Sequence, residues 1–199
     1  MKLDIILSGV GGQGILSIAT IIGQAAISNG LYLKQAEVHG MSQRGGDVQS
    51  HLRISDKPIY SDLIQKGKAQ LIISVEPMES LRYLPYLSPE GWLITNTKPF
   101  VNIPNYPDIN AVLQEVSKQP HQIAIDADKI ATEIGSALTM NMVMLGAAAE
   151  FMPISYADLE KAIQTVFSAK GEKVINMNLA ALKAGNTLAK EQRGLRFKN

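Results

Sequence analysis

The sequence predicts a doubly wound α/β fold, in which a mostly parallel sheet carries helices on both faces and the C-terminal third is largely helical. Three observations predict it. Short apolar segments of strand length alternate with longer segments of helical periodicity. A glycine-rich turn directly follows the first apolar segment. After Asp126 the pattern is helical throughout. We expect residues 1–190 to form a single domain and residues 191–199 to form a charged tail that frays.

The first strand, helix and strand of this fold are predicted near the N-terminus. Residues 3–8 form a short apolar run, which indicates a buried strand. After the turn at residues 9–14, apolar residues recur at helical spacing from Ile15 until Gly30, where a helix is expected to stop. Residues 31–36 are the second strand. This order is typical of the β-α-β unit of a parallel sheet.

The remaining strands and helices follow from the same periodicities. Four further strands are predicted, at residues 48–54, 70–75, 92–95 and 122–125. The first of them alternates apolar with polar residues, which predicts a half-exposed strand with His51 and Arg53 on its polar side. A short helix begins at Pro77. Longer helices are predicted at residues 109–118, 127–135, 139–151, 156–170 and 174–189.

Composition excludes several classes of function. Of the 199 residues, 46% are hydrophobic and 19% charged, which is ordinary for a folded soluble chain. A net charge of +1 provides no field to hold nucleic acid or an anionic membrane. Cysteine is absent, which excludes disulfides, thiolate catalysis and cysteine-held zinc or iron–sulfur clusters on this chain. No apolar run approaches ~20 residues, and Asp4 stands where a signal peptide would be apolar. We therefore expect a cytoplasmic protein.

The glycine-rich turn supports two interpretations. Gly9, Gly11 and Gly14 match the G-x-G-x-x-G pattern of Rossmann-like folds, in which backbone N–H groups at a helix N-terminus receive a phosphate. Glu37 follows about 20 residues later, where such folds place an acid on the ribose. This favours a stand-alone NAD(P)-binding oxidoreductase. Alternatively, the glycines only allow the strand and the helix to pack closely. Gln13 is expected to project from the turn toward a ligand or a partner chain.

The segment at residues 37–46 is polar and glycine-rich, and we expect a loop on the ligand side of the sheet. Arg44 offers a planar fork for a phosphate or a carboxylate. A lone histidine such as His39 is more often structural than catalytic. His39, His51 and His121 lack the spacing of metal ligands. No catalytic residue and no metal ligand is therefore predicted.

Two motifs together resemble a known family. The turn reads GVGGQGI at residues 9–15, and the polar segment reads EVHGMSQRGG at residues 37–46. In this order they resemble the gamma-type domain of the 2-oxoacid:ferredoxin oxidoreductases, and the second motif is most similar to members that act on indolepyruvate. The resemblance covers most of the chain, since SHLRIS at 50–55, NMVMLG at 141–146 and the helix at 176–185 also fit the family's pattern.

The resemblance implies a subunit rather than a self-sufficient enzyme. Family members decarboxylate a 2-oxoacid on thiamine diphosphate, pass electrons through iron–sulfur clusters to ferredoxin and transfer the acyl group to coenzyme A. This chain has no cysteine and no evident Gly-Asp-Gly…Asn segment for a magnesium-held diphosphate. Thiamine diphosphate, Mg and the 4Fe-4S clusters are therefore expected on a larger alpha-type partner subunit, and ferredoxin is expected to interact through that complex.

The resemblance assigns two groups of residues, and two hypotheses for them stay open. The anion-binding turn consists of Gly9, Gly11, Gly12, Gln13 and Gly14. The segment that faces the partner or its active site consists of Glu37, His39, Gly40, Met41, Ser42, Gln43, Arg44, Gly45 and Gly46. In the first hypothesis the turn binds coenzyme A, and Arg44 contributes charge to a coenzyme A phosphate or to the substrate carboxylate. In the second, the segment is an assembly surface.

Overall fold

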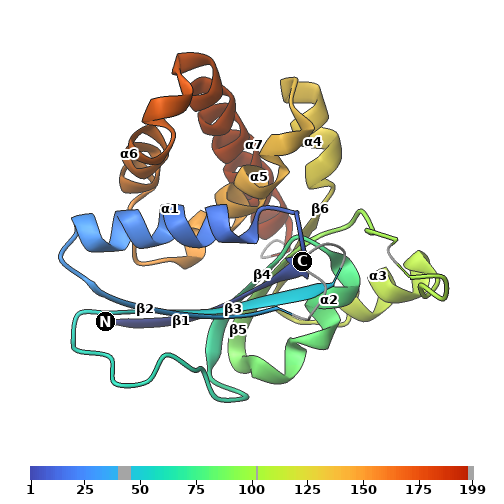
Figure 1. Cartoon of the computed structure of the whole chain (residues 1–199). Helices are drawn as coiled ribbons and strands as arrows, with labels where there is room; N and C mark the ends of the chain where they lie inside the picture. The colour runs from blue at the N-terminus through green and yellow to red at the C-terminus, as the bar shows by residue number, and fades with distance from the viewer. Residues whose placement is uncertain (40–45, 102, 197–199) are drawn as a thin grey trace.

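The chain forms one six-stranded sheet with helices on both faces (Figure 1). The computed structural model describes residues 1–39, 46–101 and 103–196. The strand order is β2-β3-β1-β4-β5-β6. The strands are β1 (Lys2–Val10), β2 (Tyr32–His39), β3 (Asp47–Ser55), β4 (Ala69–Ser74), β5 (Leu87–Asn96) and β6 (Gln122–Ile125). Three of the neighbouring pairs are parallel, which confirms the predicted fold class.

The position of β3 differs from the sequence-based expectation. Strands β1 and β2 run in the same direction, but β3 lies between them and pairs antiparallel with both. Leu52 of β3 is opposite Ile5 on one side and Gln35 on the other. The reason is the short connection between β2 and β3, because a parallel neighbour needs a crossover of about a dozen residues or more. The β-α-β unit at the N-terminus is therefore split by an antiparallel strand.

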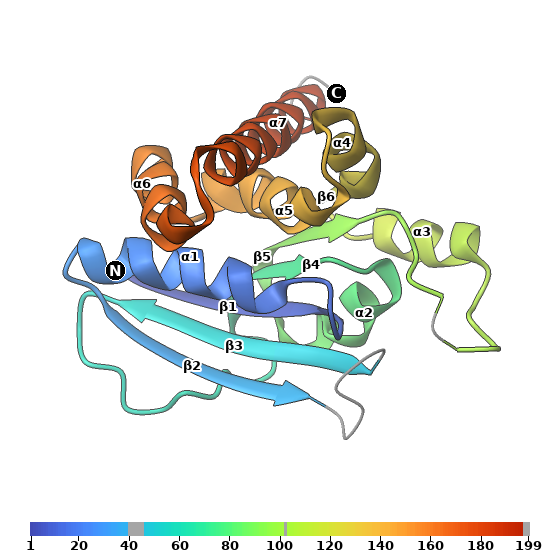
Figure 2. The same ribbon diagram turned by 45° about the horizontal axis from the view of Figure 1, so that its top comes forward.

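Helices cover the two faces unequally (Figure 2). One face carries α1 (Ile15–Ser28), α4 (Ala127–Ile134), α5 (Met140–Ala148), α6 (Tyr156–Val166) and α7 (Glu172–Arg196). Its core joins Ile5 and Leu7 of β1 to Ile18 and Ile22 of α1. The other face carries α2 (Pro77–Arg82) and α3 (Ile109–Ser117). Its smaller core includes Ile6 of β1.

The connection between β3 and β4 buries part of the side of β3 that was expected to be exposed. Arg53 donates two hydrogen bonds to the buried carboxylate of Asp4, at 2.8 and 3.2 Å. The Nδ1 atom of His51 accepts a hydrogen bond from the Ile64 backbone N–H at 2.9 Å. Burial lowers the pKa of His51, which favours the neutral ring that this bond requires. The predicted half-exposure of β3 therefore holds in part: Arg53 stays partly exposed, whereas His51 is buried because a later segment of the chain covers it.

Helices α5 and α7 approach each other at backbone distance. A Cβ atom on Gly146 would lie 2.0 Å from the Leu182 carbonyl oxygen, and one on Gly185 would lie 1.9 Å from the Val143 carbonyl oxygen. The Asn186 side-chain amide donates a hydrogen bond to the Gly146 carbonyl at 3.3 Å. Helix α5 is buried throughout, including its three methionines, as expected for a methionine-rich core segment.

Helix α7 runs well beyond residue 189, into the segment that was expected to be a frayed tail. It continues to Arg196. The Gln192 side-chain amide donates a hydrogen bond to the Ala124 carbonyl oxygen at 3.0 Å. The Arg193 guanidinium lies over the Trp92 ring at 5.9 Å and over the Phe151 ring at 5.6 Å. These contacts stabilise the last turns of the helix. Among the described residues, no helix is both long and apolar enough to cross a membrane.

The close contact of Gly146 with the backbone of α7 predicts that one added methyl group will strongly destabilise the fold. Gly146→Ala places its Cβ against rigid backbone, so we expect a loss of roughly 3 kcal/mol or more in the free energy of unfolding. Gly194→Ala, in the same helix α7, is the control, because nothing lies within 4 Å of its Cβ. That variant should gain up to about 1 kcal/mol from helix propensity. Urea unfolding measures both, and equal stability of the two variants would contradict the close contact.

Candidate functional site

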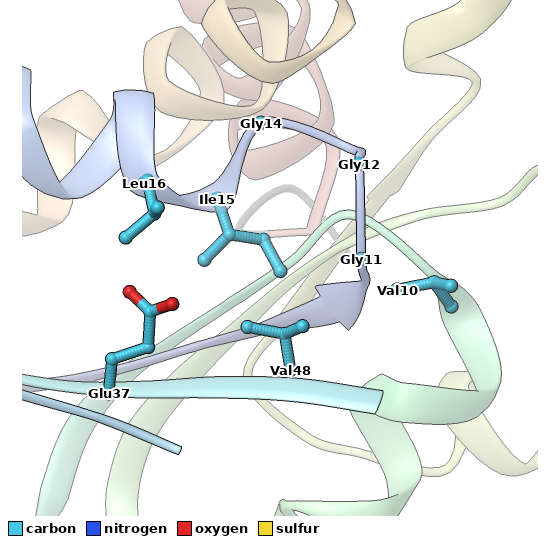
Figure 3. Close-up of a pocket in the computed structure, with 8 residues that line it drawn as sticks. All are labelled: Val10, Gly11, Gly12, Gly14, Ile15, Leu16, Glu37 and Val48. Atoms are coloured by element: carbon cyan, nitrogen blue, oxygen red, sulfur yellow. The ribbon is translucent and has the colours of Figure 1, made fainter. Parts of the chain in front are cut away.

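A pocket of about 320 Å³ lies beside the turn that joins β1 to α1 (Figure 3). It is lined by Val10, Gly11, Gly12, Gly14, Ile15, Leu16, Glu37 and Val48. The pocket is at the edge of the sheet where the parallel strands end, which is where open α/β sheets bind ligands. The walls come from β1, α1, β2 and β3, so the pocket needs the strand arrangement described above.

The glycines of the turn answer different structural demands. Gly14 caps α1 in the left-handed region at φ 80°, and Gly12 has φ 101°. A Cβ atom on Gly14 would lie 2.4 Å from the side-chain nitrogen of Asn141. A Cβ atom on Gly9 would lie 2.3 Å from Val75. Packing therefore explains Gly9, packing and backbone angle together explain Gly14, and Gly12, with nothing within 4 Å of its Cβ, is required by its backbone angle.

Two side chains hold the turn in place. Gln13 points inward: its Oε1 accepts a hydrogen bond from the Val10 N–H at 2.8 Å, and its Nε2 donates to the Val75 carbonyl at 3.4 Å. The Asn141 amide donates to the Gly14 carbonyl at 3.1 Å. Gln13 was expected to project toward a ligand or a partner. The structure instead turns it toward the sheet, because it satisfies a backbone N–H at the end of β1.

Glu37 and His39 belong to β2 and not to a loop, contrary to the sequence-based expectation. Both residues pair with β3, Glu37 with Ser50 and His39 with Val48. The strand continues because β3 supplies backbone partners that sequence periodicity does not reveal. Figure 3 shows the Glu37 side chain pointing from β2 toward the first turn of α1. The carboxylate thus faces the pocket from the side opposite the turn.

The glycine turn and the 37–46 segment meet in space. The Gly11 N–H donates a hydrogen bond to the Gly46 carbonyl at 2.9 Å. Glu37, at the other end of the segment, lines the same pocket as Gly11. The remaining predicted residues of this segment, Gly40, Met41, Ser42, Gln43, Arg44 and Gly45, lie outside the described residues. The two motifs that were predicted separately therefore border one site.

The same edge of the sheet carries a buried polar network that the sequence analysis did not assign to a site. Asn96, at the end of β5, donates to the Asp128 carboxylate at 2.7 Å and to the Val75 carbonyl at 3.2 Å. Glu76, after β4, is fully buried and caps α2 by accepting from the Glu79 N–H at 2.8 Å. The available signal was a polar residue at the end of β5, Asn96, and another shortly after β4, Glu76. Within the described part of the chain, no cluster of acidic or histidine side chains is arranged to hold a metal ion.

Comparison with known proteins identifies the family. Residues 4–188 match the family described as pyruvate ferredoxin/flavodoxin oxidoreductase. The indolepyruvate oxidoreductase subunit IorB of Archaeoglobus fulgidus is 37% identical over 194 residues, which is 93% of this chain and 94% of that protein. The protein of the same name from Pyrococcus horikoshii is 35% identical, over 98% of this chain and 99% of its own length.

A solved structure shares the fold and some sequence. The 2-oxoglutarate:ferredoxin oxidoreductase of Magnetococcus marinus, solved with 2-oxoglutarate, coenzyme A and succinyl-CoA bound, matches with a TM-score of 0.77 and 26% identity. The match covers 96% of this chain and 31% of that chain, so the present fold corresponds to about a third of the longer protein. The family match and the near full-length relatives agree with one another, and the chain belongs to the pyruvate ferredoxin/flavodoxin oxidoreductase family.

Proposed function

We propose that this chain is the small subunit of a cytoplasmic hetero-oligomeric indolepyruvate or arylpyruvate:ferredoxin oxidoreductase. The complex converts an aryl 2-oxoacid, coenzyme A and oxidised ferredoxin into the acyl-CoA, carbon dioxide and reduced ferredoxin. The names of the relatives support this assignment. A larger alpha-type subunit carries thiamine diphosphate, Mg and the 4Fe-4S clusters, because this chain has no cysteine to hold a cluster.

The chain's own contribution is a binding site for coenzyme A at the glycine turn. The observation that carries this proposal is the joining of two motifs at one pocket, through the bond from Gly11 to Gly46. Backbone N–H groups at the start of α1 suit a phosphate, and the apolar walls Val48, Ile15 and Leu16 suit an uncharged portion of the coenzyme. Arg44 stands two residues before Gly46 in the sequence, and its guanidinium binds a phosphate of the coenzyme. The coenzyme supplies the thiol that accepts the acyl group.

The position of Glu37 favours a second candidate function, the binding of NAD(P). Its carboxylate lines the pocket, as a ribose-binding acid would in an NAD(P)-binding fold. Titrating the isolated chain with NAD, NADP and coenzyme A separates the two candidates. Binding of a nicotinamide dinucleotide by the chain alone, with no response to coenzyme A and no partner subunit, would replace the proposal by a stand-alone oxidoreductase.

A pair of glycine variants tests whether the pocket binds coenzyme A. Gly12 and Gly30 both have positive φ, and a Cβ atom on either would meet nothing within 4 Å. Alanine at each position should therefore cost a similar ~1–2 kcal/mol of stability. Only Gly12 lines the pocket. We expect calorimetric titration to show coenzyme A binding weakened about tenfold in Gly12→Ala, or ~1.4 kcal/mol, and unchanged in Gly30→Ala. Equal affinities would mean that the turn only packs.

Arg44→Ala separates coenzyme binding from assembly. If Arg44 holds a phosphate, the variant should raise the apparent KM for coenzyme A about tenfold, as expected for loss of a charged hydrogen bond of ~1.5–3 kcal/mol. The complex should remain assembled on gel filtration, and the KM for the 2-oxoacid should not change. A raised KM for the 2-oxoacid alone would place Arg44 on the substrate carboxylate. Loss of the complex itself would show that the 37–46 segment is an assembly surface.

A further inference from the structure

A loop with exposed apolar side chains follows β5 at the same edge of the sheet as the pocket (Figure 2). In this connection to α3, Val101 is 68% exposed, Phe100 42% and Ile103 37%. Residues 99–107 contain no charged residue. Exposed apolar side chains that gather in one loop are unfavourable in water and typically mark a contact surface.

This loop is held at both ends by one buried carboxylate. Glu76 is 0% exposed. Its Oε1 accepts hydrogen bonds from the Phe100 N–H at 3.2 Å and from the Tyr106 hydroxyl at 2.5 Å. Its Oε2 accepts from the Glu79 N–H at 2.8 Å. Near the start of the loop, the Asn96 side-chain oxygen also accepts from the Lys98 N–H at 3.4 Å.

Glu76 positions the loop and does not itself contact a substrate. Both carboxylate oxygens are engaged by donors, and the side chain has no exposed surface from which to reach a substrate. Burial and the neighbouring Glu76 carboxylate raise the pKa of Tyr106, so its hydroxyl keeps the proton that it donates. Pro99, Pro104 and Pro107 restrict the backbone further. Phe100 and Tyr106 are thus held in place before any partner binds, which lowers the entropic cost of binding.

The loop and the pocket are mechanically connected. The Val75 carbonyl accepts hydrogen bonds from Gln13, which braces the glycine turn, and from Asn96, which holds the start of the loop. A protein seated on Phe100 and Val101 would therefore contact a loop whose start is held by the same carbonyl that braces the glycine turn.

We propose that Phe100, Val101 and Ile103 form the docking surface for the larger subunit of the oxidoreductase, and that Glu76 holds this surface in its docking conformation. The inference rests on the proposed function. Two observations identify the larger subunit as the partner that binds this docking surface. The similar proteins are named as subunits, and in the 2-oxoglutarate enzyme the matching fold is 31% of one longer chain. Because residues 99–107 are uncharged, this part of the loop suits an apolar face of the larger subunit rather than a charged electron carrier.

The test co-expresses the chain with the larger subunit from the same organism, without oxygen, and measures the affinity of the purified subunits for each other. Phe100→Ser combined with Val101→Ser should weaken binding at least tenfold, since apolar anchors dominate such interfaces. Binding of coenzyme A to the small subunit alone should not change. Tyr60→Ser is the control, because Tyr60 is 92% exposed but lies after β3, at the opposite edge of the sheet. This variant should bind the larger subunit as tightly as the wild type.

Glu76→Gln tests the positioning role, with Asp126→Asn as its match. Both carboxylates cap a helix, and Asp126 accepts from the Lys129 N–H at 2.9 Å. A glutamine amide cannot accept all three hydrogen bonds that Glu76 accepts. Glu76→Gln should lower the melting temperature and weaken binding of the larger subunit by roughly threefold or more, whereas Asp126→Asn, whose side-chain oxygen can still accept from the Lys129 N–H, should change neither. An unchanged affinity in Glu76→Gln would show that its role is limited to stability.

The outcomes separate this inference from the proposed function. If the wild-type chain does not bind the larger subunit, the proposed function fails. If the wild type binds and the Phe100 and Val101 double variant binds equally well, the docking surface lies elsewhere and only the present inference is overturned. Binding that survives high salt supports an apolar interface, whereas binding abolished by salt would assign the contact to charged residues and overturn it.

Discussion

The backbone contact between α5 and α7 is the constraint on which the rest of the structure depends. At Gly146 and Gly185 the two helices approach so closely that neither position has room for a methyl group. This contact fixes α5 above the centre of the sheet. Asn141, near the start of α5, then donates its hydrogen bond to Gly14 in the turn. The shape of the pocket therefore depends on a contact between two helices that do not line it.

A second constraint is the Val75 carbonyl at the end of β4. It receives one hydrogen bond from Gln13 and one from Asn96, so a single backbone atom supports both the glycine turn and the β5–α3 loop. A subunit that docks on the loop would therefore rest on the same backbone support as the glycine turn.

Local signals in the sequence predicted every strand, most of the helices and the position of the turn. They failed where the partner is distant in the chain. Gln13 bonds inward both to the nearby Val10 N–H and to a carbonyl 62 residues away, and Asn141 meets Gly14 across 127 residues. The placement of β3 depends on pairing with two strands at once. Periodicity describes which side of a segment is apolar but not which segment will cover it. His51 lies on the polar side of β3, yet the segment that contains Ile64 covers it.

The glycine motif shows why a short pattern specifies a shape before it specifies a ligand. Gly9 and Gly14 are required by the neighbours Val75 and Asn141, and Gly12 by its own backbone angle. None of these demands involves a nucleotide, so the same pattern serves dinucleotide enzymes and the present family alike. What distinguishes this chain is the second motif, since the bond from Gly11 to Gly46 brings the 37–46 segment to the turn. The chemistry of the site therefore depends on the pair of motifs and not on the glycines alone.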